Sequence, residues 1–141
     1  MEPQILPTLR ELGIGLVPYS PLGRGFLTGA ITSVDDLPEH DFRRRAPRFA
    51  EAALSANLAI VDVVRTNAEA KGATPAQVAL AWVLAQGEDF VPIPGKKRVR
   101  YLEENGAAAA VTLTPAERQP LDRALPEPIG DRYADMSSID A

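Results

Sequence analysis

The sequence predicts an α/β protein assembled from parallel βα units. Two short apolar runs with the composition of buried strands alternate with longer segments of helical spacing. Glycine and proline fall at the borders of these segments, where helices commonly end or begin. The expected order is helix, strand, long loop, helix, helix, strand, helix, helix, and we expect one domain over residues 1–141.

The first βα connection is predicted near the N-terminus. A helix is expected over residues 3–12, and Gly13 ends it in the usual C-terminal position. Residues 14–19 are apolar on both faces, which predicts a buried parallel strand. The apolar side chains at helical spacing in the preceding helix are Ile5, Leu6, Leu9 and Leu12.

A long polar loop is expected from residue 20 to about residue 50. Loops of this length in compact domains are often functional. The basic run at residues 43–45 is interpreted as a solvated part of the loop. His40 is the only histidine, and we expect it to be exposed rather than catalytic.

The second half is predicted to be mainly helical. A helix over residues 53–71 ends at Gly72, and a capping box with a proline at the first helical position opens the next helix, which runs to Gln86. This second helix is apolar nearly all round, so we expect it to be buried. Residues 90–93 form a second predicted strand, and helices follow at 97–105 and, behind a second capping box, at 115–125. Only two strands are convincing, and two parallel strands do not make a stable sheet alone.

Composition excludes several classes of protein. The sequence has no cysteine, so disulfides and thiolate metal sites are impossible, and no other metal-ligand spacing is present. A net charge of −4 argues against a general nucleic-acid binder. No apolar run is long enough to span a bilayer, and the N-terminus has no signal-peptide pattern. We therefore expect a cytoplasmic protein that binds neither nucleic acid nor membrane.

The first candidate site follows the first predicted strand. Ligands of βα proteins bind at this end of the strands. Glycines let the backbone approach a ligand closely, and their N–H groups can hold phosphate oxygens. A turn that only reverses the chain remains the alternative interpretation. The candidate residues are Ser20, Pro21, Leu22, Gly23 and Gly25.

Two further candidate segments follow the second strand. Gly95, Lys96, Lys97 and Arg98 precede a helix, where cations oppose the helix dipole, so their position favours an anionic ligand over a solvated charge run. Glu104 and Asn105 lie one to two turns later. Asparagine offers the donor and the acceptor that an adenine edge requires, although a solvated helix face is the simpler alternative.

In this order and spacing, the segments resemble the aldo-keto reductase family. The matching stretches are residues 19–29, 47–49, 57–72, 74–82, 92–95 and 102–105. The resemblance implies a (β/α)8 barrel of which this chain is the C-terminal part, about strands 7 and 8 with their helices. It also implies NADP(H) as cofactor. The pyrophosphate would lie along residues 20–25, the 2′-phosphate at residues 95–98, and the adenine against Glu104 and Asn105.

The activity that the resemblance implies is the NADPH-dependent reduction of small aldehydes or ketones to alcohols. The family's catalytic Asp, Tyr, Lys and His come from the first half of the barrel, so no catalytic residue is assigned in this chain. Tyr19, Tyr101 and Tyr133 do not match the position of the catalytic Tyr. The alternatives are a non-catalytic nucleotide-binding half-barrel, which self-associates or pairs with the missing barrel half, and a truncated product without function.

Overall fold

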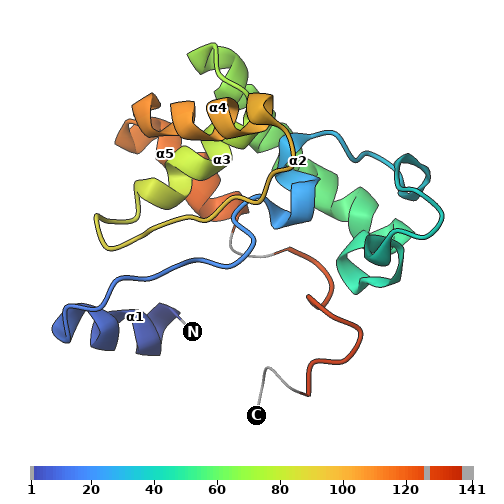
Figure 1. Ribbon diagram of the computed structural model, residues 1–141, viewed down its shortest axis with the longest axis horizontal. Coiled ribbons are helices and arrows are strands. Elements are labelled where there is room, and N and C mark those ends of the chain that lie inside the picture. The colour runs from blue at the N-terminus through green and yellow to red at the C-terminus, as the bar shows by residue number, and fades with distance from the viewer. Residues whose placement is uncertain (1, 126–127, 138–141) are drawn as a thin grey trace.

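The computed structural model describes residues 2–125 and 128–137. Within these residues the chain is mainly helical. Four α-helices gather into one group, and α1 lies apart from them (Figure 1). The α-helices are α1 (Glu2–Glu11), α2 (Glu51–Lys71), α3 (Pro75–Leu84), α4 (Val99–Ala107) and α5 (Pro115–Ala124).

The predicted helices are confirmed, with small shifts at their ends. The helix expected over residues 53–71 begins at Glu51, and the helix expected from residue 97 begins at Val99. Residues 128–137 contain neither helix nor strand, as expected for the tail, whereas 126–127 and 138–141 lie outside the described residues. None of the helices that the structure describes has the length and apolar character needed to cross a membrane.

The two predicted buried strands do not form among the described residues. Within the part of the chain that the structure describes, one parallel bridge joins Leu16 to Phe90, and the Leu16 N–H donates to the Asp89 carbonyl at 2.7 Å. The flanking apolar side chains are about half exposed: Ile14, Val17, Val91 and Ile93. A parallel sheet is stable only with further strands and with helices on both faces, and the described residues supply neither around this bridge.

Both predicted capping boxes are present. In the first, the Gln77 N–H donates to Thr74 Oγ1 at 3.2 Å, and the Thr74 N–H donates to Gln77 Oε1 at 2.9 Å. The second opens α5 through Thr114 and Glu117. Glu117 also forms an ion pair of 2.8 Å with Lys71 at the end of α2, so this carboxylate joins two helices.

Among the described residues, two hydrophobic clusters stand out within the core. The first lies between α2, α3 and α5, and its buried members are Val64, Ala68, Val78, Ala79 and Leu121. The second lies between the long loop and the start of α2, and its buried members are Ile31, Leu37, Ala46, Phe49 and Leu54. The expectation that α3 is buried on most sides is confirmed, although Leu84 is exposed and Trp82 is partly buried.

Polar contacts tie α1 to the segment before the second bridge residue. Arg10 Nε forms an ion pair of 2.8 Å with Asp89, and Arg10 Nη2 donates to the Gln86 carbonyl at 2.9 Å. The predicted apolar stripe of α1 is only partly covered, because Ile5 and Leu12 are exposed. The N-terminal helix and the bridge region therefore both leave large apolar side chains uncovered.

The predicted long loop is not irregular. It contains the short 3-10 helices η1 (Gly23–Thr28), η2 (Val34–Asp36), η3 (Phe42–Arg45) and η4 (Pro47–Phe49), and η5 (Ala108–Ala110) follows α4. Ser33 and Asp41 cap η2 and η3 with side-chain oxygens. Local caps of this kind order a polar segment that a hydrophobic pattern does not mark as structured.

Candidate functional site

The loop over residues 20–25 has a strained backbone. Ser20 and Arg24 have φ angles of 51° and 59°, although neither is glycine. Such conformations cost about 1–3 kcal/mol each for a residue with a side chain, and they gather at functional sites. Gly23 and Gly25 also have positive φ, at 58° and 92°. The glycines predicted for close backbone approach are therefore needed for the turn itself.

Apolar contacts on both sides hold this loop in place. Leu22 and Leu27 pack against the cluster between α2, α3 and α5. Phe26 packs against the second cluster, where its ring meets the edge of Phe49 with 6.2 Å between ring centroids. The loop is thus attached to both parts of the core, which explains how its strained angles persist.

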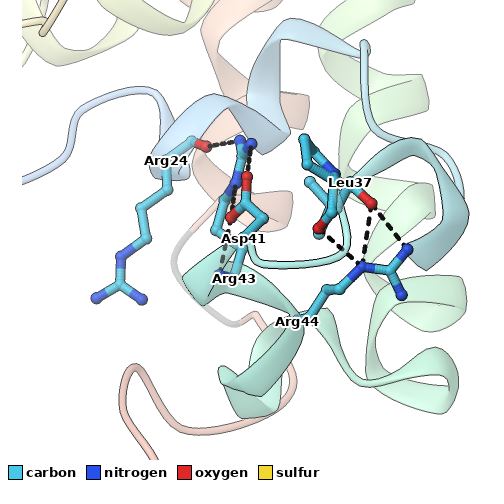
Figure 2. Close-up of polar contacts among 6 residues, drawn as sticks. Arg24, Leu37, Asp41, Arg43 and Arg44 are labelled. Atoms are coloured by element: carbon cyan, nitrogen blue, oxygen red, sulfur yellow. Dashed lines mark hydrogen bonds and ion pairs between the residues drawn. The ribbon is translucent and has the colours of Figure 1, made fainter.

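An ion pair between Asp41 and Arg43 fixes the loop backbone (Figure 2). Arg43 Nη1 donates to the Arg24 carbonyl at 2.9 Å, while Nη2 lies 2.6 Å from Asp41 Oδ2. The hydrogen bonds from Arg43 lower the pKa of Asp41 to about 2. Figure 2 shows the side chain of Arg24 extending away from this ion pair.

The interpretation of residues 43–45 as a solvated run is wrong for its first two members. Arg43 makes the contacts just described, and Arg44 Nη2 donates to the Leu37 carbonyl at 2.7 Å (Figure 2). Both side chains satisfy backbone carbonyls of the folded loop, which a charge pattern does not show. Arg45 is exposed, and the expected exposure of His40 is confirmed.

A pocket of about 600 Å³ lies between this loop, the segment after the second bridge residue, and α4. It brings together most of the candidate residues from three separate segments. Gln77 of the first capping box reaches α4, since its Nε2 donates to the Glu104 carbonyl at 3.2 Å. The candidate residues in the pocket wall are Ser20, Pro21, Leu22, Gly25, Gly95, Glu104 and Asn105.

The remaining candidates lie beside this wall. Gly23 lines a smaller neighbouring pocket. Lys96, Lys97 and Arg98 are exposed next to Gly95, and no ion pair among the described residues involves them. Arg98 is the N-cap of α4 without a side-chain cap, and the first turn holds no acidic residue. The first N–H groups of α4 thus lie beside three cations, which favours an anion there.

The pocket wall also contains residues that the sequence interpretation missed, namely Tyr19, Arg24, Thr28, Ala30, Ala76, Ile93, Pro94 and Tyr101. Helical spacing offered a signal for Tyr101, because it precedes Glu104 by three residues and Asn105 by four and so shares their face. Arg24 had a weaker signal, its position between two glycines. Tyr101 is partly covered by Arg100, whose guanidinium lies 4.5 Å from the ring centroid.

A strained glycine loop and α4 thus line one pocket, and the basic, uncapped N-terminus of α4 lies beside it. This arrangement is typical of proteins with βα units that bind a phosphorylated ligand at the ends of their strands. The model of the aldo/keto reductase family matches residues 1–126, and the chain therefore belongs to the aldo/keto reductase family. This family implies a (β/α)8 barrel.

Curated relatives carry the same family name. The chain is 50% identical over 133 residues to the NADP(+) aldo-keto reductase yakc of Schizosaccharomyces pombe, a match that covers 92% of this chain and 38% of that protein. It is 45% identical to aldo-keto reductase str7 of Strobilurus tenacellus, over 96% of this chain and 41% of that protein. It is 46% identical to the probable aldo-keto reductase 1 of Glycine max, over 93% of this chain and 37% of that protein. The chain spans about two fifths of the length of these relatives.

Proposed function

We propose that this chain forms the NADP(H)-binding end of an aldo/keto reductase that reduces aldehydes or ketones to alcohols. In this proposal residues 14–19 and 90–93 are strands 7 and 8 of the barrel, and their helices complete its C-terminal part. The observation that carries the proposal is the pocket in which Ser20, Gly95 and Asn105 meet from three distant segments.

The two ends of the pocket suit the two ends of a dinucleotide. Residues 20–25 offer a closely approaching backbone for the pyrophosphate, as glycine-rich turns do. Lys96, Lys97 and Arg98, with the uncapped start of α4, offer charge for the 2′-phosphate that distinguishes NADPH from NADH. The name of the relative from Schizosaccharomyces pombe, which specifies NADP(+), is consistent with this choice.

The adenine is assigned to the face of α4 that lines the pocket. Glu104 and Asn105 are partly buried there, beside the ring of Tyr101. Asparagine can donate to and accept from an adenine edge, and an aromatic ring gives the base a surface to stack on. This assignment makes α4 the element that holds the adenosine half of the cofactor.

The residues of this chain bind and orient the cofactor rather than transfer the proton. When bound, NADPH supplies the hydride, whereas the proton donor is assigned to the catalytic Asp, Tyr, Lys and His of the other part of the barrel. No catalytic residue is proposed among these 141 residues. The exposed side chains Ile14, Val17, Val91 and Ile93 support such pairing, since a barrel buries this edge.

The proposal is tested by fluorescence titration of the purified chain with NADPH and, in parallel, with NADH. We expect saturable binding that favours NADPH. Replacement of Lys96, Lys97 and Arg98 by alanine removes the charge that faces the 2′-phosphate. This triple variant should weaken NADPH binding about tenfold or more, and leave NADH binding unchanged. Arg123→Ala is the matched control, an exposed cation in the last turn of α5 that lies outside the pocket. Equal binding of NADPH and NADH by the parent chain would contradict the proposal.

A second candidate function is a non-catalytic nucleotide-binding half-barrel that self-associates. The uncovered apolar edge around the bridge of Leu16 and Phe90 favours it, because exposed strand edges drive association. Sedimentation equilibrium separates the two candidates. A dimer that dissociates when Val17→Lys or Val91→Lys is introduced would support self-association. A monomer would instead support pairing of this edge with the other part of the barrel. The cytoplasmic location stays a prediction from the sequence.

A further inference from the structure

A second pocket, of about 190 Å³, lies beside the pocket proposed for the cofactor. The two share Tyr19, Ser20 and Arg24 as wall residues. The second pocket is lined by η1, by η4, by the first half of α2, and by residues at and after the end of α5. Much of its wall is apolar, formed by Phe26, Leu27, Phe49, Ile60 and Leu125. Three arginines also line it: Arg24, Arg48 and Arg132.

Arg24 carries the clearest sign of a missing partner. Its Nη1 donates to the Arg132 carbonyl at 3.0 Å, but its Nη2 is buried and has no hydrogen-bond acceptor among the described residues. The guanidinium lies 4.5 Å from the ring centroid of Tyr133 and 5.5 Å from that of Phe42. Because an unpaired buried donor costs about 1–3 kcal/mol, an acceptor is expected at this position.

The other two arginines add positive charge without an ion-pair partner. Arg48 Nε donates to the Gly130 carbonyl at 2.9 Å, and the Arg132 guanidinium lies 5.5 Å from the ring centroid of Tyr19. Burial lowers the pKa of Arg48, and the charges of Arg132 and Arg24 lower it further. Within residues 2–125 and 128–137, no ion pair includes any of the three arginines, although Asp131 lies near enough to oppose this effect weakly.

The hydroxyl of Tyr19, a wall residue of this pocket, lies next to the hydroxyl of Tyr133. The hydroxyl oxygens of Tyr19 and Tyr133 are 2.8 Å apart. The hydrogen bond with Tyr133, with smaller contributions from the nearby Ser20 and Arg24, lowers the pKa of Tyr19 to about 8. Negative charge is therefore favoured at this edge, which adjoins both the arginines and the apolar wall residues.

We propose that the second pocket binds the carboxylate of a small apolar or aromatic acid, held by Arg24, Arg48 and Arg132. A planar carboxylate matches the paired donors of a guanidinium, and the apolar wall accommodates a hydrocarbon or aromatic group. The volume suits a small acid and not a dinucleotide. Resting on the function proposed above, the acid is a carbonyl substrate that also carries a carboxylate, because this pocket adjoins the one assigned to the cofactor.

The test is calorimetric titration of the full chain with benzoate, and with benzamide as the neutral molecule of the same shape. No cofactor is added, so the outcome does not depend on whether the chain binds NADPH. Benzoate should bind saturably and benzamide at least about tenfold more weakly, because only benzoate carries a charge that pairs with the partly buried arginines. A folded chain that does not bind benzoate, or that binds both molecules equally, would overturn the proposal.

Two variants locate the binding. Arg24→Gln and Arg132→Gln keep a polar side chain but remove the charge, and each should weaken benzoate binding about tenfold. Arg100→Gln is the matched control, since Arg100 is exposed and lies outside this pocket. Circular dichroism identifies any variant that fails to fold, and the benzoate affinity of the other variant is then used for the test. Unchanged benzoate affinity in both folded variants overturns the proposal. Tighter binding of inorganic phosphate than of benzoate, lost in the same variants, also overturns the assignment of a carboxylate.

Discussion

The substitution Arg43→Leu removes the side chain that connects η3 to the strained loop over residues 20–25. It deletes the hydrogen bonds of Arg43 to Asp41 and the 2.9 Å bond to the Arg24 carbonyl. The side chain of Asp41 is 14% exposed and that of Arg43 is 23% exposed, so water replaces these bonds only in part. A hydrogen bond to a charged group contributes about 1.5–3 kcal/mol. We therefore expect a loss of about 2 kcal/mol in the free energy of unfolding.

Thermal unfolding followed by circular dichroism measures this loss. For a chain of this size, about 2 kcal/mol corresponds to a Tm that is lower by roughly 6 °C. Arg45→Leu is the matched control, because Arg45 is exposed in the same short helix and should change stability by less than about 0.5 kcal/mol. Equal Tm values for the two variants would refute the structural role of Arg43.

A second measurement separates stability from the conformation of the loop. If Arg43 holds Arg24 in its positive-φ conformation, Arg43→Leu should also weaken NADPH binding, by about tenfold for a cost of 1.4 kcal/mol. A double-mutant cycle with Asp41→Asn gives the coupling energy of the ion pair. A lower Tm with unchanged cofactor affinity would mean that the loop keeps its conformation without this contact.

Three further outcomes are expected. The folded-state pKa of Asp41, about 2, lies below its ordinary value of 3.8. The contribution of Asp41 to stability is therefore complete above about pH 4 and is lost as the pH falls toward 2. In the variant Asp41→Asn, the denaturant concentration at the midpoint of unfolding should depend less on pH over this range. Tyr19 should ionise near pH 8 in an absorbance titration, Tyr133→Phe should move this transition toward 10, and Tyr19→Phe should abolish it. Asn57→Leu breaks the bonds between Asn57 and Ile129, at 2.7 and 2.9 Å, and should cost about 1–3 kcal/mol and expose the tail to proteolysis; an unchanged cleavage rate would contradict this.

The sequence predicted the elements whose signals are local. The two capping boxes, formed by Thr74 with Gln77 and by Thr114 with Glu117, each depend on residues within a span of four, and both are present as expected. The strands could not be predicted from local signals in the same way, because an apolar run such as residues 14–19 forms a strand only when other strands pair with it. The charges of Arg43 and Arg44 were misjudged for a related reason, since their partners are backbone carbonyls that only the folded loop brings near.

The candidate site was predictable as separate pieces rather than as a whole. Glycines after a strand and cations before a helix each indicated phosphate, and the pocket unites the segments that contain them. The arginine-lined pocket had no such signal. It forms because buried Asn57 binds Ile129, 72 residues away, and thereby brings Arg132 toward Arg24.

The attachment of Leu22, Leu27 and Phe26 to two separate hydrophobic clusters has a consequence for motion. A loop packed on one cluster can open by a local fluctuation, whereas this loop can leave its position only when both clusters loosen. Its amide hydrogens should therefore exchange with solvent at rates close to those of α2 and α3, unlike those of an ordinary surface loop. The segment that must meet a ligand would then be as rigid as the centre of the protein, and binding would require little ordering of the backbone.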